Sequence, residues 1–254
     1  MQRRDAAEPA TCHNPLVPMP APTNERAWTL RRALVEGWTA AKANARAMAF
    51  IQAIAVGVVW AYYAWPDFER ATRAIGPWRD RMGLPGSFVV GFIAGGLVPE
   101  LAKLATRQVE RLDREALSRL AFVGLVYGVL GIQIDLFYRL QSVWFGHGVD
   151  VGTIARKLAI DMGLAAPLIF IPYSVGMFLW RERGFRLGAL RELFTWQVYR
   201  DRILTIQVMN WFVWIPVLCA IYALPLPLQF PLSSLIEACW SLLLVVMAAP
   251  KEEG

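Results

Sequence analysis

The stretch Leu120–Phe145, LAFVGLVYGVLGIQIDLFYRLQSVWF, contains two charged residues, Asp135 and Arg139, and is otherwise mostly apolar. About 20 mostly apolar helical residues are enough to cross the hydrocarbon core of a bilayer. Within the stretch, glycines recur at helical spacing, at positions 124, 128 and 131. The sequence therefore predicts a transmembrane helix here, with one side that lets a neighbouring helix approach closely.

Five further apolar runs lie on both sides of this stretch, and each is long enough for most of a membrane span. They are Ala47–Trp65, Pro85–Ala105, Ile154–Trp180, Ile203–Leu224 and Leu232–Ala248. The predicted fold class is all-α, a polytopic membrane helix bundle of five or six transmembrane helices. The last run is short, and prolines at 225, 227 and 231 forbid a regular helix before it. The last two runs are therefore either two spans or one span plus a tilted or partial helix.

The composition of the 254-residue chain supports a membrane protein. Apolar residues make up 56% and charged residues 18%, whereas soluble domains are nearer 45–50% and about 25%. The 11 tryptophans fit the aromatic belts that form at membrane–water interfaces. This composition argues against an ordinary cytosolic enzyme and against a disordered chain.

The basic residues predict how the bundle is oriented. Residues 103–119 carry five Lys or Arg and residues 181–202 carry six, whereas the link 146–153 carries none. Loops rich in Lys and Arg stay on the cytoplasmic or matrix side of a membrane. This asymmetry accounts for the net charge of +6, and we expect no nucleic-acid partner because no long basic run is present.

Two pairs of ionisable residues lie inside apolar runs, where a charge is costly and marks a functional candidate. Asp135 and Arg139 are four residues apart, as are Lys157 and Asp161, so each pair shares a helix face. We expect the two pairs to form one buried network. That network is either a clamp that locks helices together or the charged lining of a pore, and Arg139 and Lys157 lie near enough to helix ends to reach the interface.

A second group of polar residues lies within or beside the other runs. Asn210 is expected to make an interhelical hydrogen bond, and Glu237 to lie near the bilayer edge because its run is short. Together with Glu100 and Gln207 these residues could line a polar path. Trp211, Trp214 and Trp240 are either packing and belt residues or a stack for a ligand.

Three motifs in the second half of the chain resemble those of a known membrane-protein family. The first is GIQIDLFY at 131–138, where Gly131 and Tyr138 match a Gly-Pro-x-x-His-x-Trp-Tyr stretch. The second is KLAIDMGLAAP at 157–167, where the Lys, the Asp and the last Pro match. The third comprises NWFVWIP at 210–216 and LPLQF at 226–230.

In the order and spacing of these motifs the chain resembles the Mpv-seventeen/PMP-twenty-two family of mitochondrial inner-membrane and peroxisomal proteins. The resemblance implies a small helical bundle that forms a channel or carrier. The chain departs from the family pattern at four positions, Ile132, Asp135, Phe137 and Met162, and it lacks the final Arg of the third motif. The chain would be a distant member with an extra N-terminal span, and a bacterial source is one reading of that distance.

Composition and the resemblance together suggest a division of the chain. Residues 1–25 are expected to form a disordered tail, and residues 26–83 an amphipathic segment, the extra transmembrane helix and a loop. Residues 84–249 form the family-like bundle and 250–254 a short tail. With no secretory signal at the start, we expect an internal helix to direct insertion.

The sequence contains no motif of a soluble catalytic centre, such as a phosphate-binding glycine loop, Gly-x-Ser-x-Gly or His-Glu-x-x-His. The two histidines, His13 and His147, and the three cysteines lack metal-ligand spacing. We therefore predict no enzyme, no metal and no cofactor, and rank an intramembrane enzyme third.

The first functional hypothesis is a channel or carrier for small solutes or ions. Its lining would be Glu100, Asp135, Arg139, Lys157, Asp161 and Asn210. The alternative is a non-transporting structural or assembly subunit of a membrane complex. Expected partners are the lipid bilayer, small solutes or ions, and a second copy or a complex partner. High Ala and Arg usage favours a bacterial inner membrane, with mitochondrial inner or peroxisomal membranes as alternatives.

Overall fold

The computed structural model describes Val35, Trp38, Lys42 and residues 45–105, 107, 109, 111 and 113–247, some by backbone only. The predicted N-terminal tail, most of the amphipathic segment and the C-terminal tail lie outside these residues. All regular structure in the described part is helical, which confirms the all-α prediction. The α-helices are α2 (Ala45–Ala64), α3 (Pro66–Arg73), α4 (Ile75–Phe92), α5 (Val98–Ala105), α6 (Arg114–Phe145), α7 (Val151–Ile160), α8 (Ile171–Glu182), α9 (Ala189–Glu192), α10 (Trp196–Val198), α11 (Leu204–Tyr222) and α12 (Leu226–Met247).

Three π-helical segments continue these helices without a break: η1 (Ile93–Leu97), η2 (Asp161–Phe170) and η3 (Tyr199–Ile203). In the described residues, four continuous stretches are long and apolar enough to cross a membrane. They are Arg81–Ala105, Arg114–Phe145, Val151–Glu182 and Trp196–Tyr222. A fifth span is formed if the helices Met48–Ala64 and Pro66–Arg73 are counted together as one span; their axes are bent by 101° relative to each other. The chain is therefore an integral membrane protein.

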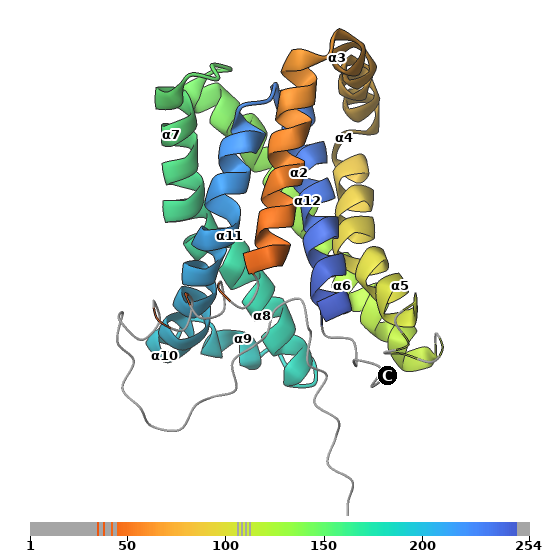
Figure 1. Cartoon of the computed structure of the whole chain (residues 1–254). Coiled ribbons are helices and arrows are strands. Elements are labelled where there is room, and N and C mark those ends of the chain that lie inside the picture. The colour runs from red at the N-terminus through yellow and green to blue at the C-terminus, as the bar shows by residue number, and fades with distance from the viewer. Residues whose placement is uncertain are drawn as a thin grey trace, which may run out of the picture.

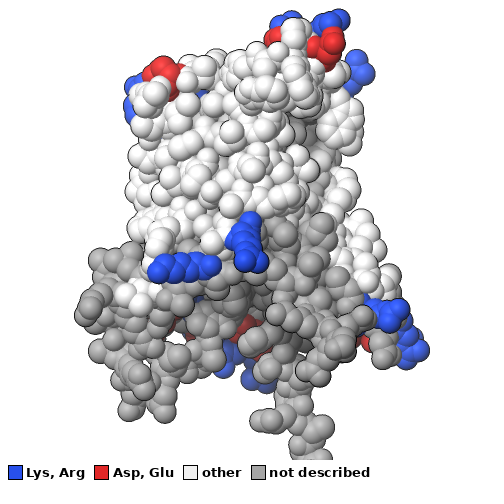
Figure 2. Space-filling model, viewed as in Figure 1, with Lys and Arg blue, Asp and Glu red and all other residues white. Residues whose placement is uncertain are grey.

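The long helices run alongside one another as a bundle (Figure 1). The helix α2 packs against α11 and α12, and α6 packs against α4, η1 and α12. Charged side chains gather at the two ends of the bundle and leave a broad uncharged surface between them (Figure 2). An uncharged band with polar ends is the surface that a bilayer requires of a spanning bundle.

Glycine allows a close helix contact between α4–η1 and α6. A Cβ atom on Gly91 would lie 2.4 Å from the carbonyl oxygen of Tyr127, and one on Gly96 would lie 2.5 Å from Cα of Gly124. Backbone therefore meets backbone across this interface, as the small residues of the sequence predict.

The final helix corrects one prediction. The prolines at 227 and 231 were expected to prevent a regular helix, yet α12 starts at Leu226 and includes both. Pro227 costs little because the first N–H groups of a helix have no intrahelical partner. With 22 residues, α12 is about 33 Å long, and Glu237 lies near its middle rather than at the bilayer edge.

Candidate functional site

A half-open cavity of about 200 Å³ lies inside the bundle, between α6, η2–α8, α11 and α12. Most of its lining is apolar, but six polar side chains from three of the spans and from α12 reach it. They are Tyr127, Tyr138, Asp161, Ser174, Asn210 and Glu237. Aromatic rings of Phe170, Trp214 and Trp240 complete the wall. A mostly apolar cavity with a few convergent polar groups is the usual form of a small-molecule site.

Asp161 is the first carboxylate of the cavity and belongs to η2. The residue is buried, with 3% of its surface exposed. Its carboxylate accepts a hydrogen bond from the hydroxyl of Tyr222 on α11. The ring of Tyr222 is completely buried and packs edge-on against Tyr138. Tyr222, itself packed against Tyr138 of α6, thus holds the side chain of Asp161 at the cavity wall.

Glu237 is the second carboxylate and comes from α12. In the part of the chain that the structure describes, no hydrogen bond or ion pair reaches its side chain. The sequence ranked it below the two charged pairs because its helix was expected to be short. The extra turn at the start of α12 places it at the depth of the cavity instead.

Lys157 does not form the expected ion pair with Asp161, although both residues are described and buried. Its ammonium group lies 6.0 Å from the centroid of the Tyr222 ring, in a cation–π contact. The expectation assumed α-helical geometry, in which residues four apart face one way. That geometry is present, since the backbone N–H of Asp161 donates to the Lys157 carbonyl. The pair does not form because Tyr222 engages both side chains, Asp161 through its hydroxyl and Lys157 through its ring.

Asp135 and Arg139 do form an ion pair, 3.3 Å apart, as their spacing predicts. Asp135 is fully buried and also accepts a hydrogen bond of 2.7 Å from the hydroxyl of Ser87 on α4. Arg139 is 39% exposed and so extends toward the helix end. This pair joins α6 to α4 and does not line the cavity, so the expected single network of four charges is wrong: Asp135 and Asp161 belong to separate sites.

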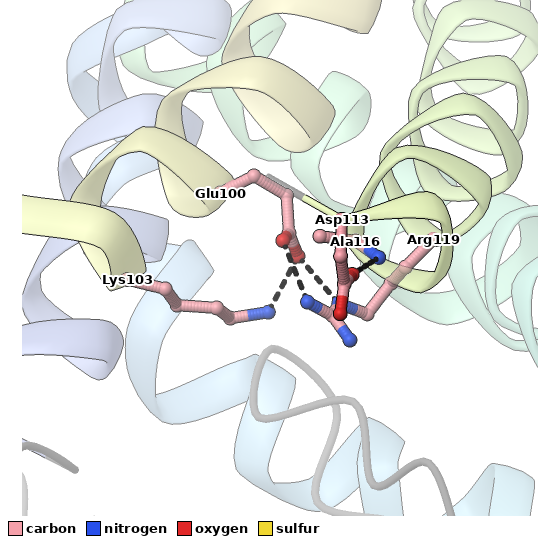
Figure 3. A network of polar contacts seen from close by, with 5 residues as sticks. All are labelled: Glu100, Lys103, Asp113, Ala116 and Arg119. Carbon is pink, nitrogen blue, oxygen red and sulfur yellow. Dashed lines mark hydrogen bonds and ion pairs between the residues drawn. The ribbon is translucent and has the colours of Figure 1, made fainter. Parts of the chain in front are cut away.

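Glu100 forms a third site at the opposite end of α6 (Figure 3). Its buried carboxylate accepts from Lys103 Nζ at 2.7 Å and from two nitrogens of Arg119, at 3.0 and 3.1 Å. The bidentate contact with Arg119 has the planar geometry of strong guanidinium–carboxylate pairs. Beside it, Asp113 caps α6 by accepting from the backbone N–H of Ala116. Glu100 therefore ties α5 to the start of α6.

A carbonyl next to the cavity is satisfied from another helix. In π-helical bonding the N–H of residue 167 would donate to the carbonyl of residue 162, but residue 167 is proline. Instead, Gln207 Nε2 and Trp211 Nε1 of α11 donate to the Met162 carbonyl, at 2.9 and 3.0 Å. Asn210 lies between them in sequence and contacts Met162 Sδ at 3.8 Å. The Met162 carbonyl, which Pro167 leaves without its helical donor, is thus hydrogen-bonded to α11.

No family model matches the chain, and neither the curated proteins nor the solved structures provide a match. The family resemblance drawn from the three motifs is therefore neither supported nor contradicted by these comparisons. What the cavity can do has to be argued from its own geometry.

Proposed function

We propose that the protein is a membrane carrier for small solutes and that the cavity between α6, η2–α8, α11 and α12 is its solute site. The observation that carries this proposal is the set of six polar side chains, two of them carboxyl groups, that reach the cavity inside an apolar bundle. Ionisable groups inside a membrane are costly and commonly mark the path of a solute or ion. A volume of about 200 Å³ holds about seven water molecules at roughly 30 Å³ each, which suits one small solute.

The interrupted helix beside the cavity also supports a carrier. Transporters commonly bind solutes near the bilayer midplane, where helices are broken and the freed backbone groups line a cavity. The π-helical η2 contributes Asp161 to the wall, and Pro167 interrupts its backbone bonding. A helix interrupted at this point is suited to bend as the site opens and closes.

Proteoliposomes provide the test, with osmotic swelling measured for urea, glycerol and choline chloride. Ser174→Phe fills the cavity from its wall, while Ser118→Phe makes the same change at an exposed position on α6. We expect the protein to accelerate swelling with at least one solute, and Ser174→Phe alone to abolish that effect. Circular dichroism and the unfolding midpoint of both variants check that they fold. Swelling no faster than in protein-free liposomes, or equal effects of both variants, would contradict the carrier.

A structural subunit is the second candidate, and the clusters around Glu100 and Asp135 favour it. Both are closed contacts that join neighbouring helices and leave no carboxylate facing the cavity. In that role the protein would hold a larger membrane complex together. Inactive proteoliposomes, together with co-purification of a fixed partner in a defined ratio, would favour this reading.

The membrane and the orientation complete the proposal. The end of α5 and the start of α6, which flank one basic segment, lie at the same end of the bundle as α9 and α10, which lie within the other (Figure 1). We place this end on the cytoplasmic side. A bacterial inner membrane suits this arrangement best, and the suggested family relationship belongs to the same proposal.

A further inference from the structure

Two features distinguish the cavity from the rest of the described interior: two acidic side chains line it, and no Lys or Arg does. Asp161 and Glu237 both line the cavity, whereas Lys157 does not. The Lys157 ammonium is associated with the Tyr222 ring. With all three side chains charged, this part of the bundle carries one excess negative charge.

Charge is expensive in an apolar bundle, and the other two buried acids are neutralised by contacts. Glu100 has Lys103 and Arg119, and Asp135 has Arg139 and Ser87. Asp161 has the hydroxyl of Tyr222, and Glu237 has no contact of this kind among the described residues. Glu237 therefore presents a carboxyl group with full hydrogen-bonding capacity to whatever enters the cavity.

The remaining wall suits an organic cation better than a metal ion. Trp214, Trp240 and Phe170 present aromatic rings, and aromatic faces attract ammonium groups when water is excluded. In the described residues no group of three metal-ligating side chains is present. The amide of Asn210 adds a polar group beside the rings.

We infer that the cavity binds a small organic ammonium ion, with Glu237 as its main counter-charge and the tryptophan rings as its apolar wall. This inference rests on the proposed carrier function and adds the class of solute. Asp161, held by Tyr222, supplies a second negative charge at the wall.

The test uses the full chain in nanodiscs of phosphatidylglycerol, a lipid without an ammonium headgroup. Binding of choline is followed by the fluorescence of the cavity tryptophans and by calorimetry. The neutral isostere 3,3-dimethylbutan-1-ol has the same shape without the charge. We expect choline to bind at least about tenfold more tightly than the alcohol, since the difference reports the charge interaction.

Variants assign the charge interaction to its residue. Glu237→Gln should weaken choline binding at least about tenfold and leave binding of the alcohol unchanged. Glu192→Gln, which changes an exposed acid at the end of α9, should leave both unchanged. Equal binding of the two ligands, binding of neither, or a Glu237→Gln variant that binds choline normally would overturn the inference.

The outcomes also separate this inference from the carrier proposal. Binding of the alcohol alone would leave the cavity as a solute site and remove only its cation preference. Failure of the swelling experiment, with choline still bound, would remove transport and leave a binding site. Repeating the titration in phosphatidylcholine identifies the source of the ammonium group: competition indicates a lipid headgroup, and an unchanged titration indicates a free solute.

Discussion

At the scale of single residues, Glu100 is a buried carboxylate that pairs with two cations, Lys103 and Arg119. Replacing it with Ala leaves Lys103 and Arg119 without their shared carboxylate in a buried position. We expect a loss of unfolding free energy on the order of 3 kcal/mol, as for other buried ion pairs that lose one partner. Unfolding in detergent micelles measures this loss.

The exposed pair of Glu69 and Arg73 on α3 provides the control for Glu100. An exposed pair contributes little because water screens it. Glu69→Ala should therefore leave the unfolding midpoint unchanged within error. Equal losses in the two variants would show that the Glu100 cluster does not stabilise the bundle.

Asp150 predicts a pH dependence outside the membrane. It caps α7 by accepting from the N–H of Thr153 at 3.0 Å. Hydrogen bonds from the hydroxyl and the backbone of Thr153 hold the pKa of its carboxyl below the ordinary value. The ionised cap therefore stabilises the fold above the unfolded-state pKa of about 3.9, and this stabilisation is lost as the pH falls through the lower folded-state pKa.

Asp150→Asn should flatten that part of the pH profile. Asparagine retains a capping oxygen but has no proton to gain. The unfolding midpoints of the two proteins are measured from about pH 7 to pH 3. The midpoint of the unchanged protein should fall more steeply in acid than that of the variant, so that the two midpoints approach each other there. Parallel profiles would exclude a contribution from Asp150.

At the scale of elements, the glycine contact between α4–η1 and α6 sets how closely these helices approach. Gly91→Ala would place a Cβ 2.4 Å from the Tyr127 carbonyl, where only movement of a whole helix can relieve the clash. We expect a loss of about 1–3 kcal/mol, as for other overpacked sites. In Gly57→Ala on α2 the new Cβ meets nothing within 4 Å, so this variant should be neutral or slightly stabilised in the same unfolding experiment.

The bridge from α11 to the Met162 carbonyl predicts a coupling between two helices. Gln207→Leu removes one of two donors and should cost about 1 kcal/mol. In a Pro167→Ala background residue 167 regains an N–H, which can donate to this carbonyl, so the same change should cost less. A double-mutant cycle on the unfolding free energy measures the difference, and strictly additive effects would mean that the proline does not cause the bridge.

At the scale of the whole molecule, the distribution of basic residues predicts the topology. Single cysteines at Leu187 and at Val149 lie at exposed loop positions on the two sides of the bundle. In a variant without the native cysteines, a membrane-impermeant maleimide should label position 149 in intact cells and position 187 only after lysis. The reverse pattern would invert the proposed orientation.

The sequence predicted the spans well because apolar length is a local property. The runs around Leu120–Phe145 and Ile154–Trp180 fall within α6 and α7–η2–α8. The cavity could not be predicted, because it depends on which faces of α6, η2–α8, α11 and α12 meet. The predicted pairing of Lys157 with Asp161 is wrong because Tyr222, distant in the sequence, contacts both side chains. Glu237 was misplaced because α12 begins earlier than its prolines suggest.

The bend of 101° between α2 and α3 has a consequence for the membrane in which the protein can reside. The helix α3 has no buried residue and carries charged pairs, so it suits the boundary between lipid and water. The 20 residues of α2 then cover about 30 Å below that boundary. The sharp turn thus limits how much of the chain around α2 can lie in hydrocarbon. A bilayer much thicker than this length would bring α3 into hydrocarbon or tilt the bundle. The protein should therefore sort to membranes that match its hydrophobic thickness.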